Sequence, residues 1–198
     1  AKYKLKTNRM NNTEFLKKYF NDLNNLLKTG SEDINKLVTV SEILKKTSTA
    51  GKRTLIFGNG GSSAIASHFS VDLTKNAKIK ANNFNESDLI TCFSNDFGYE
   101  KWVEKSIEFY ADDGDTVILI SASGNSPNMV NGAKKAREMK LTKIITFTGN
   151  SIDNELKKLG DINFWVDSKA YNHIENIHQI LLLSIVDLII GKSEYPPN

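Results

Sequence analysis

The chain has 198 residues, of which 39% are hydrophobic and 25% charged, and its formal net charge is +3. These values are typical of one soluble globular domain, and the charge is too small to indicate nucleic acid as a partner. The single cysteine, Cys92, excludes an intrachain disulfide framework, and we expect it to be a small buried core residue. No apolar leader begins the sequence, so we expect a cytoplasmic protein.

The first fifty residues predict two helices after a polar, basic tail at residues 1–10, which we expect to be loose. Apolar residues recur at three- and four-residue spacing from Thr13, and Gly30 ends this pattern. Ser31 begins a second pattern of the same kind. Residues 1–50 therefore predict a helical hairpin, which can cover a sheet face, pack on a sister subunit, or do both.

From Arg53 onward, apolar runs typical of strands alternate with stretches typical of helices. This order predicts an α/β fold with a doubly wound five-stranded parallel sheet. We expect a single domain over residues 1–198, with residues 51–198 as its α/β core. The predicted strands are Arg53–Phe57, Leu89–Ser94, Thr116–Ser121, Lys143–Thr148 and Ile162–Val166, and the predicted helices are Ser62–Lys75, Phe97–Asp112, Pro127–Lys140, Ile152–Leu159 and Ile174–Ile190.

Two stretches of this core stand apart by composition. The polar segment Asn76–Ser87 predicts a mobile loop. The most apolar segment, Ile180–Ile190, is too short to span a bilayer and predicts a buried helix, so we expect no membrane segment.

A glycine-rich turn, Gly58-Asn59-Gly60-Gly61-Ser62-Ser63, follows the first predicted strand and leads into a helix. Backbone N–H groups at a helix start, with glycines that allow close approach, favour an anion. The Gly-Lys-Ser/Thr of a Walker A loop does not follow, and Ser63 stands where a dinucleotide-binding turn has its third glycine. The turn therefore predicts an anion site, with a dinucleotide site as an alternative.

A serine-rich turn, Ser121-Ala122-Ser123-Gly124-Asn125-Ser126-Pro127, follows the third predicted strand. Ser126 fits the N-cap position of the next helix and Pro127 its first turn. Serine hydroxyls beside a helix start can bind phosphate without a lysine. A capped helix alone is the alternative, but capping does not explain Ser121 and Ser123.

A third polar cluster, Ser94-Asn95-Asp96-Phe97-Gly98, follows the second predicted strand, so we expect it at the same sheet edge. Asn95 and Asp96 offer an amide and a carboxylate to sugar hydroxyls. The alternative is that Asp96 only caps the following helix.

Taken together, four motifs resemble the SIS (sugar isomerase) domain family, and within it the phosphoheptose isomerase branch. The resemblance runs from about Thr13 to Ile190 and implies an isomerase that interconverts sedoheptulose 7-phosphate and a heptose 7-phosphate. A neighbouring branch of non-catalytic proteins, which bind a replication initiator, is similar as well. The four motifs are Gly58–Ser62, His68-Phe69, Asn95–Gly98 and Ser121–Ser126.

The resemblance implies which residues bind a phosphorylated sugar. In this family the serine turn holds the phosphate, while the glycine turn and the Asn-Asp pair map to other parts of the site. The implied substrate-binding residues are Asn59, Gly60, Gly61, Ser62, Asn95, Asp96, Ser121, Ala122, Ser123, Ser126 and Glu175.

The resemblance also implies a zinc site that shares ligands with catalysis. The family's His and Glu, four apart on one helix, fall on His68 and Asp72, and its Gln and His, eight apart on the last helix, fall on Glu175 and Leu183. Leu183 can neither bind metal nor carry a proton. His68, Asp72 and Glu175 then predict a three-ligand site for a divalent metal, with zinc as one candidate. Asp72 and Glu175 are the predicted catalytic residues, and Glu175 acting without a metal is an alternative.

We therefore expect an aldose–ketose isomerase for a phosphorylated sugar. Because Leu183 replaces the family's acid/base His, the alternative is a non-catalytic phosphosugar-binding or regulatory protein. The resemblance implies a homotetramer, and the apolar N-terminal helices and last helix agree with subunit contacts.

Overall fold

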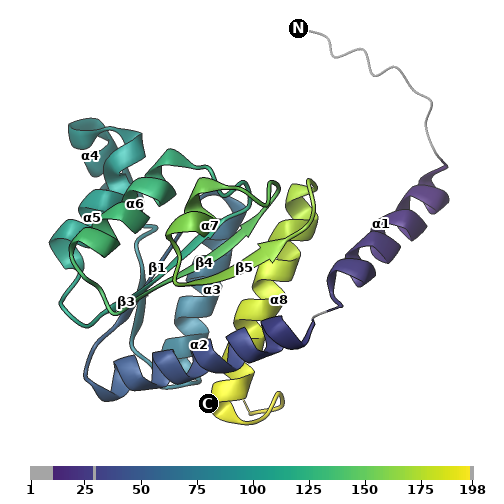
Figure 1. The fold of residues 1–198 in the computed structure, drawn as a ribbon, viewed down its shortest axis with the longest axis horizontal. Helices are drawn as coiled ribbons and strands as arrows, with labels where there is room; N and C mark the ends of the chain where they lie inside the picture. Colours follow the sequence, from purple (N-terminus) through teal and green to yellow (C-terminus); the bar gives the residue numbers. More distant parts are fainter. Residues whose placement is uncertain (1–10, 29, 197–198) are drawn as a thin grey trace, which may run out of the picture.

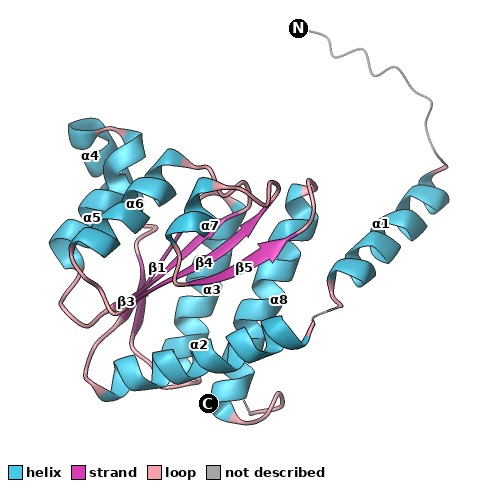
Figure 2. Cartoon of the chain, viewed as in Figure 1, coloured by secondary structure: helices cyan, strands magenta, loops and turns pink. Residues whose placement is uncertain are grey.

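The computed structural model describes residues 11–28 and 30–196 of the chain, as an α/β domain (Figures 1 and 2). The predicted loose tail of residues 1–10 lies outside the described residues. The elements are α1 (Asn12–Leu26), α2 (Ser31–Thr49), β1 (Thr54–Gly58), α3 (Gly61–Lys75), β2 (Ala81–Asn83), α4 (Ser87–Phe97), a 3₁₀ turn (Tyr99–Lys101), α5 (Trp102–Tyr110), β3 (Thr116–Ser121), α6 (Pro127–Glu138), β4 (Lys143–Gly149), α7 (Glu155–Leu159), β5 (Ile162–Val166) and α8 (Tyr171–Ile190).

All five strands form one parallel sheet in the order β2-β1-β3-β4-β5. The chain builds β1 and β2 toward one side, then returns to place β3 on the other side of β1. Ligands of such sheets bind beyond the carboxyl ends of the strands at this switch point. Gly58 of β1 pairs with Ile120 of β3, so the turns after these two strands leave the sheet side by side.

Helices cover both faces of the sheet, which confirms the predicted doubly wound architecture. Alternate strand residues face opposite sides: Ile56 and Ile118 pack with α2, α3 and α8, whereas Leu55 and Leu119 pack with α5, α6 and α7. The fully buried strand residues make β1 and β3 rigid supports for the turns that follow them.

The second strand and the helix after it differ from the prediction. Leu89–Ser94 is part of helix α4, and β2 lies inside the segment that was expected to be a mobile loop. Leu89, Ile90 and Phe93 follow helical spacing and pack their apolar sides on the core. The strand itself is a three-residue polar edge strand, which gives no apolar run. Cys92 consequently lies exposed on α4 and is not a core residue.

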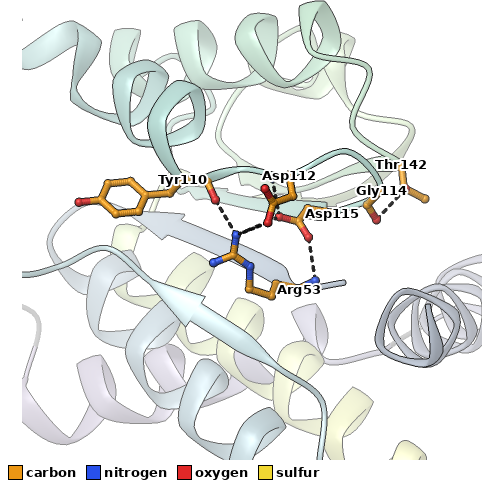
Figure 3. A network of polar contacts seen from close by, with 6 residues as sticks. All are labelled: Arg53, Tyr110, Asp112, Gly114, Asp115 and Thr142. Atoms are coloured by element: carbon orange, nitrogen blue, oxygen red, sulfur yellow. Dashed lines mark hydrogen bonds and ion pairs between the residues drawn. The ribbon is translucent and has the colours of Figure 1, made fainter. Parts of the chain in front are cut away.

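A polar network fixes the amino ends of β1 and β3, opposite the switch-point turns (Figure 3). The buried Asp115 carboxylate accepts the backbone N–H of Arg53 at 2.8 Å and that of Asp112 at 2.9 Å. The Arg53 guanidinium donates to the Tyr110 carbonyl at 2.7 Å and to Asp112 at 2.9 Å. These bonds hold the two central strands in register at this end.

The two N-terminal helices are present and have different surroundings. On α2, Val40 and Leu44 are fully buried against the sheet. The described residues of α1 include none that is buried, and α1 extends away from the body (Figure 1). Its contacts lie near the start of α8, where the Tyr19 ring meets the His173 ring at 4.2 Å between centroids.

Helix α8 closes the domain along α3 and α2 (Figure 1). By length and apolarity alone this helix could cross a membrane, but 39% of its apolar 18-residue stretch is buried inside the domain. Leu182 and Ile185 belong to the core on the α2–α3 side of the sheet. These contacts are those of a core helix.

Candidate functional site

The turn between β1 and α3 brings the chain into very close contact with itself. A Cβ at Gly58 would overlap the backbone of Ser62, so only glycine fits there. Gly60 has a φ of +53°, a conformation that favours glycine, and α3 begins at the next residue. A Cβ at Gly61 would overlap the carboxylate of Glu175 from α8. The glycine turn therefore lets Glu175 lie directly on the start of α3.

The turn between β3 and α6 gathers three hydroxyl groups. Ser121 Oγ lies 3.2 Å from Ser126 Oγ and 3.5 Å from Ser123 Oγ, and the last two are 3.5 Å apart. Gly124, at a φ of +67°, packs so closely on Asn154 that a Cβ would overlap its side chain. The three hydroxyls thus form a triangle beside the N-terminus of α6, where a phosphate can accept from all of them.

Ser126 occupies the N-cap position of α6, as predicted, but its side chain makes no capping hydrogen bond. Its hydroxyl faces the other two serines instead. A capping role therefore does not explain this side chain, and the serine turn fits the phosphate interpretation.

Two asparagines join these turns. Asn59 Nδ2 donates to Asn128 Oδ1 at 3.0 Å, and Asn128 Nδ2 donates to Asn59 Oδ1 at 2.8 Å. Tyr99 OH donates to Asn59 Oδ1 at 3.2 Å. Asn128 is buried, and its amide is engaged by Asn59.

The two turns and α8 enclose a pocket of about 170 Å³ at the switch point. It combines a hydroxyl triangle for an anion, amide and hydroxyl groups for a sugar, and one carboxylate. A larger hollow between α2 and β5 is lined mainly by charged side chains and contains no serine or threonine hydroxyl. The pocket is lined by Asn59, Ser62, Ile120, Ser121, Ala122, Ser123, Ser126, Tyr171 and Glu175.

Comparison with known proteins assigns the family. The family model described as SIS domain matches residues 18–149, which include both turns of the pocket. The chain belongs to the SIS domain family.

Curated relatives of this SIS domain carry the name phosphoheptose isomerase. The protein from Fusobacterium nucleatum is 31% identical over 80% of this chain and 83% of its own length. The protein from Aliarcobacter butzleri is 32% identical over 83% and 87%. The solved structure of phosphoheptose isomerase from Neisseria gonorrhoeae shares the fold with a TM-score of 0.82 at 24% identity, covering 89% of this chain and 98% of that one.

The predicted metal ligands of this SIS domain are not gathered in one place. His68 Nε2 lies 3.3 Å from Asp72 Oδ2, whereas Glu175 lies on Gly61 in the pocket. Within residues 11–28 and 30–196, no group of three His, Cys, Asp or Glu side chains could hold a metal. The three-ligand prediction therefore does not fit this geometry.

Both ring nitrogens of His68 are engaged. Gln179 Nε2, which can only donate, lies 3.1 Å from His68 Nδ1 and fixes that nitrogen as the acceptor. The proton is then on Nε2, which faces Asp72. Neither nitrogen has a free lone pair for a metal in this arrangement.

The predicted Asn-Asp pair does not reach the pocket. Asn95 and Asp96 lie exposed on α4 and bond to each other at 2.9 Å. The sequence pattern predicts a strand over Leu89–Ser94 and therefore places this pair at the sheet edge, but that segment is helical. From the segment that follows α4, Tyr99 donates its hydroxyl to the pocket residue Asn59.

Sequence reasoning missed Tyr171 and Gln179. Both lie four residues from Glu175 on α8, one before and one after, so they share a helix face with it. That spacing was the available signal. Tyr99 left no such signal, because its partner Asn59 is distant in the sequence.

Proposed function

We propose that this SIS domain is an aldose–ketose isomerase of a phosphorylated sugar, of the phosphoheptose isomerase type. One observation carries the proposal: the Glu175 carboxylate lines the same pocket as the serine triangle and Asn59. A phosphate on the hydroxyls would hold one end of the sugar, and the small pocket would bring its carbons to the carboxylate. Relatives that are about 31% identical and bear this name support it.

The proposed chemistry moves one proton between adjacent carbons. A base removes it from the carbon next to the carbonyl, an enediolate forms, and a proton returns to the former carbonyl carbon. The hydroxyl proton passes between the two oxygens, so the product has the same atoms. In our proposal Glu175 is this base, and the Asn59 amide stabilises an oxygen of the intermediate.

Asp72 lies outside the described pocket, and its catalytic role stays a prediction. It faces His68, which Gln179 holds on its other side. The proposed mechanism includes no step on a metal, because the predicted ligands do not fit one site. Isothermal titration of the purified chain with Zn²⁺ tests the metal prediction, and binding that His68→Ala abolishes would support it.

The proposal is tested with sedoheptulose 7-phosphate, following aldose formation with and without divalent metals. The unmodified chain should turn over, and Glu175→Gln should lower kcat at least about 100-fold because the base is lost. Glu42→Gln, on the exposed side of α2, is the matched control and should keep full activity.

Leu183 favours one alternative, a phosphosugar-binding protein without catalysis. That protein would bind sedoheptulose 7-phosphate in a calorimeter and release it unchanged. Binding without turnover under every metal condition would contradict the isomerase proposal and support this alternative.

We propose further that the chain works in the cytoplasm as a homo-oligomer, with the homotetramer implied by the family resemblance. The support is the exposed apolar surface of α1, where Phe15, Leu16 and Phe20 are each more than half exposed. Sedimentation equilibrium of the full chain measures the subunit number.

A further inference from the structure

The strongest unassigned feature is the orientation of the Asn59 side chain. Its amide and that of Asn128 exchange two hydrogen bonds, at 3.0 and 2.8 Å. A 180° turn of either amide alone would place oxygen against oxygen and nitrogen against nitrogen. The pair is therefore stable only when both amides are oriented together.

The Met129 backbone selects which of the two joint orientations exists. Its N–H donates to two acceptors, Asn128 Oδ1 at 3.1 Å and the Ser126 carbonyl at 3.0 Å. A backbone N–H can only donate, so the oxygen of Asn128 must face it. The Asn128 nitrogen then faces Asn59 Oδ1, and this bond sets the Asn59 amide in turn.

Tyr99 completes the arrangement from the other side. Its hydroxyl donates to Asn59 Oδ1, which already accepts from Asn128. Both lone pairs of this oxygen are then used, and one of the two N–H bonds of Asn59 Nδ2 is used by Asn128. Among the residues that the structure describes, the second N–H of Asn59 has no partner. Asn59 lines the pocket, so this group is available to a ligand there.

We infer that Asn128 and Tyr99 are positioning residues that hold Asn59 as a fixed single donor to an oxygen of the bound sugar. The inference rests on the proposed function, because it assigns a task to a wall of the same pocket. Asn128 lies in the first turn of α6, directly after the serine triangle. The hydrogen bonds between Asn59 and Asn128 therefore tie the position of the phosphate to that of the Asn59 donor. Neither Asn128 nor Tyr99 needs to touch the substrate.

A double-mutant cycle tests this coupling through the kinetics. Asn128→Ala should lower kcat/KM for sedoheptulose 7-phosphate about tenfold, the worth of one oriented hydrogen bond. In an Asn59→Ala background the same change should have less than about a twofold effect, because a positioning residue acts only through its partner. An equal loss in both backgrounds would overturn the inference.

Tyr99→Phe is the gentler second variant: because Tyr99 is exposed, removal of its hydroxyl should leave the fold intact. It should lower kcat/KM about threefold in the native background and have no effect beside Asn59→Ala, as expected for one exposed hydrogen bond. Tyr110→Phe is the matched control: this exposed tyrosine lies on α5, outside the pocket lining, and its loss should leave kcat/KM unchanged.

A readout without substrate separates this inference from the proposed function. In ¹⁵N NMR of the full ligand-free chain, the two Asn59 side-chain amide protons should exchange with water at clearly different rates. Asn128→Ala should make the rates equal. Equal rates in the unmodified chain would overturn the inference, whereas unequal rates in a chain without isomerase activity would overturn the proposed function alone.

Discussion

At the scale of single residues, Gly61 and Glu175 depend on one another. Gly61 is the first residue of α3, and its missing side chain leaves the volume that the Glu175 carboxylate fills. The backbone at Gly61 is not in the left-handed region, so another residue could adopt it. The glycine is therefore required for the position of the carboxylate and not for the helix.

Gly61→Ala should separate activity from folding. The new methyl group would displace the carboxylate, and a misplacement of about 1 Å can cost about 100-fold in kcat. The free energy of unfolding should change little, because alanine is a good helix former. Steady-state kinetics and urea unfolding measure the two effects. Gly30→Ala, at a glycine with open space around it, is the control, and full activity in Gly61→Ala would contradict the assignment of Glu175.

The serine triangle makes a second prediction at this scale. Ser121→Ala or Ser123→Ala should weaken the binding of inorganic phosphate about five- to tenfold, since each removes one hydroxyl donor. Calorimetry on the full chain measures this. Ser184→Ala, exposed on α8 and distant from β3 in the sequence, should leave phosphate affinity unchanged. Unchanged affinity in both triangle variants would argue against a phosphate at this turn.

At the scale of elements, sequence patterns predict the central strands well and the edge strand poorly. β3 and β5 have the predicted bounds because strands with buried residues leave apolar runs. β2 is Ala-Asn-Asn, paired on one side only, and its polarity resembles that of a loop. Because β2 has no apolar run, the apolar residues of α4 give the stronger strand pattern, and the prediction is wrong there for this reason.

Helix α1 carries the main prediction at this scale. Phe20 is 61% exposed, and burying such a ring against another subunit would contribute about 1.5–3 kcal/mol per copy. Phe20→Glu should therefore lower the subunit number measured by sedimentation, while α2–α8 keep their fold. Ile152→Glu, also at an exposed apolar residue, should not. An unchanged subunit number in Phe20→Glu would place the contact elsewhere.

At the scale of the whole molecule, much of the site could be predicted because its parts are local. The glycine turn and the serine turn each follow a strand directly, and residues of both turns line the pocket. The contacts between them were not predictable, since Asn59 and Asn128 are 69 positions apart. A single sequence gives no signal for such a pair, and the same holds for His68 with Gln179.

His178 makes the stability of the whole domain depend on pH. It is fully buried, its Nε2 lies 3.0 Å from the Thr148 carbonyl, and burial lowers its pKa from 6.5 to about 4. The unfolded chain therefore takes up a proton more readily than the folded one. The contribution of neutral His178 to the free energy of unfolding is complete above about pH 6.5. It is lost as the pH falls toward 4, by about 3 kcal/mol in total.

Urea unfolding between pH 7.5 and 4.5 measures this loss. His178→Gln should be less stable at pH 7.5 and should lose less stability than the unmodified chain as the pH falls. If the free energy of unfolding fell equally with pH in both proteins, groups other than His178 would account for the acid sensitivity.

The position of the pocket between β1 and β3 also has a consequence for folding. Its two walls come from distant parts of the chain, and the segment between them includes β2, α4 and α5. Contacts of such long sequence separation form late, after the loop between them has closed. A phosphorylated sugar can therefore recognise only the chain in which the central strands have already paired. A phosphorylated sugar added during refolding should therefore leave the folding rate unchanged. The same sugar should lower the unfolding rate of the finished domain.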